Sequence, residues 1–181
     1  QDLCPQHEVR WSTEIDGVSW QLQGQWSDLR RGGWTRTRFD DFHVADVLEA
    51  WCHHLLLCTS PPEGVNMTTR WIGRDGGFVF KPCMEPSVHL EQALQAMAQG
   101  LSEPLPFFPR TAWAYAQSGY QRNAALGEWQ VSPLRRFAES QDVACQWAWR
   151  GQPDPLSAHW SRFDALTRGI FEPLLQHMEQ T

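Results

Sequence analysis

The sequence predicts a mixed α/β domain, because its hydrophobic periodicity changes along the chain. Up to about residue 42, apolar and polar residues alternate, as in half-buried strands. From residue 44, apolar residues recur every three or four positions, as on a helix with one buried face. A second strand pair and further helices follow. We therefore expect a mixed sheet of about five strands flanked by helices, with residues 1–181 forming a single domain.

A tight hairpin is expected at the start of the strand region. Residues 9–12 and 18–23 alternate apolar and polar side chains, as strands with one buried face do. Asp16 and Gly17 lie between them and form one of the most favoured two-residue hairpin turns. The two segments should therefore pair as antiparallel strands.

A third strand is predicted over residues 34–39. It follows the turn-forming pair Gly32 and Gly33. Arg36 and Arg38 should share one face, because strand side chains repeat every two residues. We expect this strand to continue the hairpin as an antiparallel meander.

An amphipathic helix and a second hairpin are expected next. Apolar residues spaced by three and four predict a helix over residues 44–58, and Pro61 follows as a stop signal. Residues 68–73 and 77–80 are rich in β-branched and aromatic side chains. The Arg-Asp-Gly sequence at residues 74–76 predicts the turn between them.

The remaining chain is predicted to be helical. Pro86 and Gly100 bracket one helix, since proline favours the first helical position and glycine follows helix ends. Further helices are expected over residues 111–123, 133–139 and 157–179. Pro173 should kink or divide the last of them, because proline cannot donate its helical hydrogen bond.

Composition excludes several classes of protein. No apolar run approaches the roughly 20 residues that a bilayer span needs. The formal net charge of −6 disfavours a free-standing nucleic-acid binder, whose affinity would depend on neutralising phosphates. The five scattered cysteines favour a reducing, cytoplasmic location over a disulfide scaffold. We also expect a fragment of a longer chain, because no initiator Met or leader is present, and we expect it to be a monomer by itself.

Two residue types are unusually distributed. Lys81 is the only lysine among the 15 basic residues, and the chain contains 11 tryptophans. Coding bias and a tryptophan-rich core would account for both features. Alternatively, arginine and tryptophan form a partner-facing surface, since both are enriched at the residues that dominate interface energy.

The common catalytic motifs are absent from the sequence. Lys81 lies in no glycine-rich phosphate loop, and no G-x-S-x-G nucleophile motif is present. Cys52, His53, His54 and Cys58 are potential zinc ligands. On the predicted helix, however, Cys52 and His53 point in different directions and Cys58 falls on the apolar stripe, which favours a core cysteine.

Carboxylate pairs raise the possibility of a magnesium-dependent nuclease. In the restriction-like nuclease fold, an acidic residue and a lysine two positions apart on one strand face the same metal site. Lys81 has Val79 at that position, so it cannot complete such a pair from its own strand. We therefore expect no metal, no cofactor and no catalytic activity in this domain.

Several segments in the same order resemble the C-terminal domain of RecC, a subunit of bacterial exodeoxyribonuclease V. These segments are QLQGQW (21–26), RTR (36–38), LEAWCHHLLLC (48–58), RDGG (74–77), EQAL (91–94) and the closing residues 163–175. Each motif is weak by itself. Their shared order over most of the chain carries the resemblance.

The resemblance implies a restriction-endonuclease-like core, of the PD-(D/E)XK type, that has lost its active site. Active relatives carry a metal-binding Asp soon after a glycine and an Asp-x-Lys-like pair on the next strand. Here Gln25 and Trp26 follow Gly24, and Phe39 follows Arg38, so the metal-binding set is not retained. A degenerate but active nuclease remains the alternative, with a cluster such as Asp40, Asp41 and Asp46 holding Mg²⁺.

The resemblance further implies a structural role in the RecB–RecC–RecD complex, an ATP-dependent helicase-nuclease of double-strand break repair and homologous recombination. The expected partners are RecD, RecB and, through the assembled complex, DNA. The expected task is to recruit RecD and to help shape the path of the DNA.

Two groups of residues are candidates for these contacts. The first lies around the Gly32-Gly33 turn and consists of Arg30, Arg31, Trp34, Arg36 and Arg38. It forms either a solvated hairpin balanced by nearby acids or a local positive patch for phosphates or an acidic partner. The second group precedes the 151–153 loop and consists of Trp147, Trp149 and Arg150. These side chains are either core residues or anchors for a partner.

Overall fold

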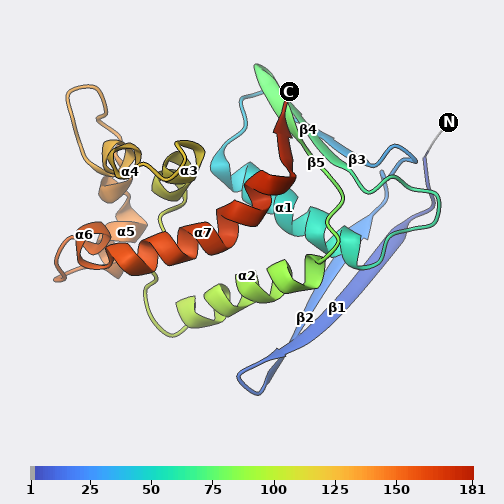
Figure 1. Ribbon diagram of the computed structural model, residues 1–181, viewed down its shortest axis with the longest axis horizontal. Helices are drawn as coiled ribbons and strands as arrows, with labels where there is room; N and C mark the ends of the chain where they lie inside the picture. Colours follow the sequence, from blue (N-terminus) through green and yellow to red (C-terminus); the bar gives the residue numbers. More distant parts are fainter. Residues whose placement is uncertain (1–2) are drawn as a thin grey trace. The chain divides into compact units, whose positions relative to one another are not determined.

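The computed structural model describes residues 3–181, which divide into two compact units. The first unit contains the residues up to Gln95 together with Pro173–Thr181, and the second contains Ala96–Glu172. The chain is of mixed α/β class, as the sequence predicts (Figure 1). The single-domain interpretation stays a prediction. Each unit is described separately below.

The first unit opens with the predicted hairpin. Strands β1 (His7–Ile15) and β2 (Val18–Trp26) pair antiparallel, with His7 opposite Trp26 and Ile15 opposite Val18. The turn residues Asp16 and Gly17 adopt φ values of 51° and 77°. Aspartate and glycine tolerate this left-handed backbone, so the turn prediction is confirmed with its physical cause.

A separate sheet of four strands has the order β3-β4-β5-β6. Its strands are β3 (Trp34–Thr37), β4 (Thr69–Gly73), β5 (Gly76–Phe80) and β6 (Met178–Gln180). The β4–β5 hairpin is the predicted one, whereas β6 lies where a helix was expected. The prediction of a single sheet of about five strands was therefore wrong, because the strands form two sheets.

The antiparallel meander was also wrong. Strand β3 pairs parallel with β4, with Trp34 opposite Thr69. A parallel pair needs a crossover connection, and helix α1 (Val44–Thr59) supplies it. Gly33 fixes the start of β3 at a φ of 108°, where a Cβ atom would lie 2.3 Å from the Thr68 carbonyl oxygen. The glycine pair thus brings β3 against β4 rather than back onto the first hairpin.

Helix α1 lies at the centre of the first unit. It contacts β1, β2 and β4, so it packs on strands of both sheets. Trp51 packs against Phe80 of the second sheet in a tilted arrangement with ring centroids 5.1 Å apart, and Phe78 and Phe80 are fully buried. Each large apolar side chain buried in this way contributes roughly 1.5–3 kcal/mol. Helix α2 (Pro86–Gly100) has the predicted bounds.

The second unit is helical. Its elements are α3 (Pro109–Gln117), α4 (Arg122–Trp129), the 3-10 turn Glu139–Gln141, α5 (Val143–Ala148), α6 (Pro155–Ala158) and most of α7 (Trp160–His177). Phe108 packs against Trp129 with ring centroids 4.3 Å apart and against Phe163 at 6.2 Å. This aromatic cluster forms the core of the unit.

Three helix predictions for the second half of the chain need correction. The helix expected over 111–123 ends at Gln117, because Gly119 and Tyr120 adopt left-handed φ values of 71° and 64°. Residues 133–138 are not helical. Helix α7 continues through Pro173 to His177 and is therefore not divided there. No helix within residues 3–181 combines the length and apolar character that a membrane crossing requires.

Candidate functional site

A pocket of about 250 Å³ lies in the first unit where β2 ends and β3 begins. Residues 24–28 line it together with Trp34, Arg36 and His53. This is the part of the chain where the resemblance locates the lost metal site. Two candidate contact residues, Trp34 and Arg36, thus share one pocket.

Trp34 is a buried anchor of this pocket. Only 4% of its surface is exposed, so it offers a partner almost no area. Its indole nitrogen donates a hydrogen bond to Asp28 Oδ1 at 3.0 Å. The guanidinium carbon of Arg36 lies 5.5 Å from the Trp34 ring centroid, within the range of a cation–π contact. Trp34 therefore orients Arg36 and Asp28.

His53 presents an unsatisfied polar atom beside the pocket. Its Nδ1 is buried and has no hydrogen-bond partner among the described residues. Burial lowers the pKa of His53, Glu49 opposes this effect and the Arg36 charge adds to it. The ring is therefore neutral at physiological pH, and Arg36 is the only cationic side chain lining this pocket.

Arg30 and Arg31 are exposed and make no ion pair with any residue in the 3–181 range. Their backbones are fixed, because Arg30 exchanges two hydrogen bonds with Gly33 and the Arg31 carbonyl accepts one from Asn66. Asp28 is one of the acids expected to balance these arginines, but its carboxylate accepts a hydrogen bond from Trp34. Arg30, Arg31 and Arg36 thus make no ion pair within residues 3–181, and we call them the free arginines.

Arg38 is not one of the free arginines. Its Nη1 lies 2.7 Å and 2.6 Å from the two carboxylate oxygens of Asp46. The other acids of the proposed magnesium cluster are also paired, because Arg74 contacts Asp41 at 2.8 Å and Asp40 at 3.6 Å. Within residues 3–181, no group of three or more acidic, histidine or cysteine side chains is placed to hold a metal ion.

The sequence analysis missed the buried polar centre of the first unit. His54 is fully buried, with Nδ1 2.9 Å from Thr69 Oγ1 and Nε2 2.8 Å from the Lys81 carbonyl oxygen. It ties α1 to β4 and to the end of β5. The signal was available, because His54 follows Trp51 by three residues and so falls on the apolar stripe. Cys58 Sγ lies 3.6 Å from His54 Nε2, while Cys52 is exposed.

The second group of candidates lies in the second unit. Trp147 is 70% exposed and is the only exposed tryptophan, since all eleven lie among the described residues. Arg150 lies 5.8 Å from its ring centroid. Trp149 is half-buried and lies beside His159, with ring centroids 5.2 Å apart. The tryptophan-rich core therefore accounts for most of the tryptophans, and Trp147 is the exception.

The segment 131–150 carries further exposed apolar side chains. The exposed fractions are 100% for Leu134, 85% for Phe137 and 68% for Val143. Large aromatic and aliphatic side chains that are exposed in this way are the kind that a protein partner covers. We call Leu134, Phe137, Trp147 and Arg150 the docking group.

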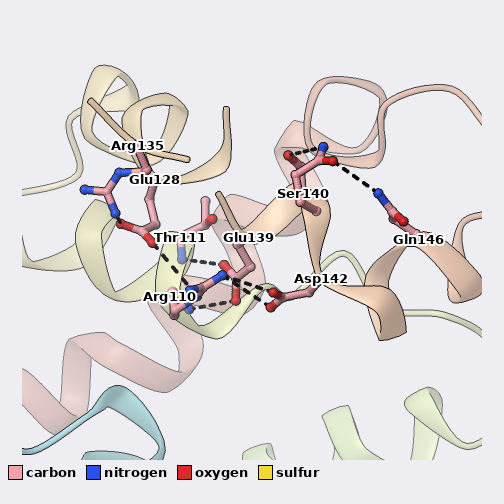
Figure 2. A network of polar contacts seen from close by, with 9 residues as sticks. Arg110, Thr111, Glu128, Arg135, Glu139, Ser140, Asp142 and Gln146 are labelled. Atoms are coloured by element: carbon pink, nitrogen blue, oxygen red, sulfur yellow. Dashed lines mark hydrogen bonds and ion pairs between the residues drawn. The ribbon is translucent and has the colours of Figure 1, made fainter. Parts of the chain in front are cut away.

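A polar network supports the base of this segment (Figure 2). Glu139 is buried and accepts hydrogen bonds from the backbone N–H groups of Arg110 and Thr111, at 3.0 and 2.6 Å. It therefore satisfies the first turn of α3 and neutralises part of the helix dipole. Asp142 and Glu128 hold the Arg110 side chain, at 3.3 and 3.9 Å.

Comparison with known proteins identifies the family. The model of the RecC C-terminal domain family matches residues 2–120. The RecBCD enzyme subunit RecC of Escherichia coli (strain K12) is 30% identical, over 65% of this chain and 11% of its own length. The chain therefore belongs to the RecC C-terminal domain family. It spans about a tenth of that relative, and residues 121–181 lie beyond the range that the family model matches.

Proposed function

We propose that this chain is a non-catalytic assembly module of a RecBCD-type helicase-nuclease, acting in double-strand break repair and homologous recombination in the cytoplasm. Its main task is to recruit the RecD subunit, next to RecB. Its second task is to help shape the path of the DNA. The family membership and the relative's printed name support the choice of complex.

The observation that carries this proposal is the docking group. Leu134, Phe137 and Trp147 expose most of their surface, whereas the other tryptophans are buried or half-buried. Large rigid side chains supply most of the energy at protein interfaces with modest entropic cost. Their exposure is favourable if a partner covers them in the assembled complex.

The proposed absence of catalysis is supported by the ion pairs that the candidate metal-binding carboxylates form with arginines. Asp40 and Asp41 pair with Arg74, and Asp46 pairs with Arg38. A carboxylate neutralised by a guanidinium is a poor ligand for Mg²⁺, which needs several free oxygens in near-octahedral geometry. The proposed ancestry is a restriction-endonuclease-like core, supported by the parallel β3–β4 pair with its crossover helix and the following hairpin.

Co-purification tests the proposal. The full-length subunit lacking this segment is expressed with its partners, and the subunits that remain bound are quantified. We expect RecD to be lost while RecB is retained. Retention of RecD at full stoichiometry would refute the recruiting role. The absence of catalysis is tested in two further assays. This chain should not cleave linear DNA when Mg²⁺ is added. Mg²⁺ alone should not shift the Tm of the chain, because no site within residues 3–181 binds it.

A further inference from the structure

A second pocket, of about 570 Å³, lies in the second unit and has no role so far. It is formed by the end of α4, the 3-10 turn, α5 and the start of α6. Asp154 is the only charged side chain that lines it, and no lysine or arginine does. The other lining groups are two indoles, a thiol, neutral polar side chains and the apolar residues Val131 and Pro155.

Asp154 is a fixed, ionised acceptor at this pocket. Its Oδ1 accepts a hydrogen bond from the Trp129 indole at 2.7 Å, and its Oδ2 accepts one from the Ser157 backbone at 2.9 Å. Burial raises the pKa of this carboxyl, but the hydrogen bonds from Ser157 and Trp129 outweigh burial and hold the pKa below its usual range. The residue is nevertheless exposed, so each oxygen keeps a lone pair for a ligand.

The half-buried indole of Trp149 is the aromatic side chain at this pocket that a ligand can reach. Trp129 also lines the pocket, but it is only 3% exposed and serves to hold Asp154. Both indoles pack against Phe108, with ring centroids 4.3 Å and 6.4 Å away, so Trp149 is held in place. A planar cation gains from stacking on an indole face, so Trp149 favours a flat, positively charged group.

The neutral side chains add hydrogen-bond acceptors. The amide nitrogen of Gln146 donates to Gln141 Oε1 at 3.4 Å, and that of Gln141 donates to Ser140 Oγ at 3.5 Å. Both amide donors are therefore used within this series of hydrogen bonds, which Figure 2 shows between Gln146 and Ser140. The side-chain amide oxygen of Gln146, Oε1, accepts no hydrogen bond within residues 3–181. It remains available to a donor.

The electrostatic environment selects the sign of the ligand. Burial raises the pKa of Cys145, which lines the pocket, to about 11, and the charges of Glu139, Asp142 and Asp154 contribute to the shift. The acidic side chains near the thiol are negatively charged, and Asp154 itself lines the pocket. The Asp154 carboxylate would repel an anion, and an apolar group would leave the remaining acceptor positions of Asp154 and Gln146 without a donor.

We propose that this pocket binds the guanidinium group of an arginine side chain on a partner protein. The guanidinium donates to Asp154 and to Gln146, and its plane stacks on the accessible part of the Trp149 indole. Arginine fits better than lysine, because its planar fork of donors matches a carboxylate and stacks on aromatic rings. This proposal depends on the proposed assembly role in one respect only, which is the assumption that the ligand belongs to a partner protein.

A peptide titration tests this site without any subunit of the complex. The full chain is titrated with acetyl-Gly-Arg-Gly-amide while the indole N–H signals of Trp129 and Trp149 are followed by NMR. The matched control contains citrulline, which keeps the shape of arginine without its charge. We expect saturable shifts with the arginine peptide and at least about tenfold weaker binding of the citrulline peptide, as for a lost charged hydrogen bond.

Two variants make the test specific. Gln146→Lys introduces a cation at the pocket on an exposed helix position and should abolish the shifts. Gln152→Lys adds the same charge in the loop outside the pocket and should leave them unchanged. Equal binding of the citrulline or a lysine peptide, or no saturable shift with the arginine peptide, would overturn the proposal. The peptide titration and the RecD co-purification use different readouts. A failure of the arginine site can therefore be told apart from a failure of the proposed assembly role.

Discussion

Arg38 and Asp46 form an ion pair that joins the end of β3 to the first turn of α1, with one guanidinium nitrogen contacting both carboxylate oxygens. Arg38 Nη1 lies 2.7 and 2.6 Å from the two Asp46 oxygens, and Asp46 Oδ2 also accepts the backbone N–H of His43 at 2.7 Å. The Asp46 side chain is only 13% exposed, so solvent screens the pair weakly. Arg38 is therefore a structural residue of the crossover.

The first prediction concerns this capping ion pair. Asp46→Ala should lower the free energy of unfolding by about 1–2 kcal/mol, because it removes an N-terminal cap of α1 together with the partner of Arg38. Glu179→Ala is the control, since it breaks the exposed pair with Lys81 and should cost about 0.5 kcal/mol or less. Urea denaturation measures both. Equal destabilisation by the two variants would contradict the assignment.

The second prediction separates the free arginines from Arg38. Replacing Arg30, Arg31 and Arg36 with Ala in the assembled complex should reduce the salt dependence of DNA binding, because each lost phosphate contact makes the slope of log binding constant against log salt concentration shallower by about 0.9. Arg38→Ala should leave this slope unchanged, since Asp46 already neutralises Arg38. The measurement is the DNA-binding constant of the complex at several salt concentrations. An unchanged slope in the triple variant would exclude contact with DNA by this group.

The third prediction concerns pH and His54. Burial lowers the pKa of His54 from 6.5 to about 4, the hydrogen bond with the Lys81 carbonyl opposes this effect, and the His177 charge adds to it. Between about pH 6.5 and 4 the unfolded chain therefore binds a proton that the folded chain does not. Stability is full above pH 6.5 and falls on acidification by up to about 1.4 kcal/mol per pH unit.

His54→Gln tests this dependence. The variant should be less stable at pH 7, because it disturbs the contacts with Thr69 and Lys81, but its stability should fall less steeply between pH 6.5 and 5. His159→Gln replaces an exposed histidine and serves as the control. Denaturation at several pH values gives the slopes. A slope in His54→Gln equal to that of the unmodified chain would show that another group is responsible.

The fourth prediction contrasts two glycines. A Cβ atom on Gly24 would lie 2.5 Å from the Trp26 ring and 2.9 Å from Leu56, so Gly24→Ala should destabilise the first unit by about 1–3 kcal/mol. A Cβ atom on Gly169, inside α7, would meet nothing within 4 Å. Gly169→Ala should therefore stabilise the chain by about 0.5–1 kcal/mol. Opposite shifts of Tm are expected, and shifts of the same sign would contradict this packing.

Local signals in the sequence predict local structure well. The Asp16-Gly17 turn specifies its hairpin, and the apolar stripe specifies α1 within one residue of its end. The partner of β3 was not predictable in this way. The Gly32-Gly33 pair is compatible with a hairpin, and only the tertiary contact of Gly33 with Thr68 directs β3 into the second sheet. Strand β6 was missed for the same reason, since its pairing with β5 joins distant parts of the chain.

The candidate sites were predicted only in part. Sequence alone cannot show that Trp34 is buried or that Asp46 neutralises Arg38, because both depend on contacts formed in the fold. Trp147 is accessible, as a partner contact would require, and its role as a contact stays a prediction. Leu134 and Phe137 were missed because that stretch was predicted as a helix, whereas the structure leaves it irregular and exposed.

The central claim is that exposed side chains of the docking group recruit RecD. The most direct measurement is the ratio of RecD to RecB that co-purifies with the full-length subunit carrying Phe137→Ala and Trp147→Ala. Phe39→Ala is the matched control, because Phe39 is an equally exposed aromatic residue in the first unit. We predict that the double variant loses RecD and keeps RecB, while the control keeps both. Full RecD stoichiometry in the double variant would contradict the account.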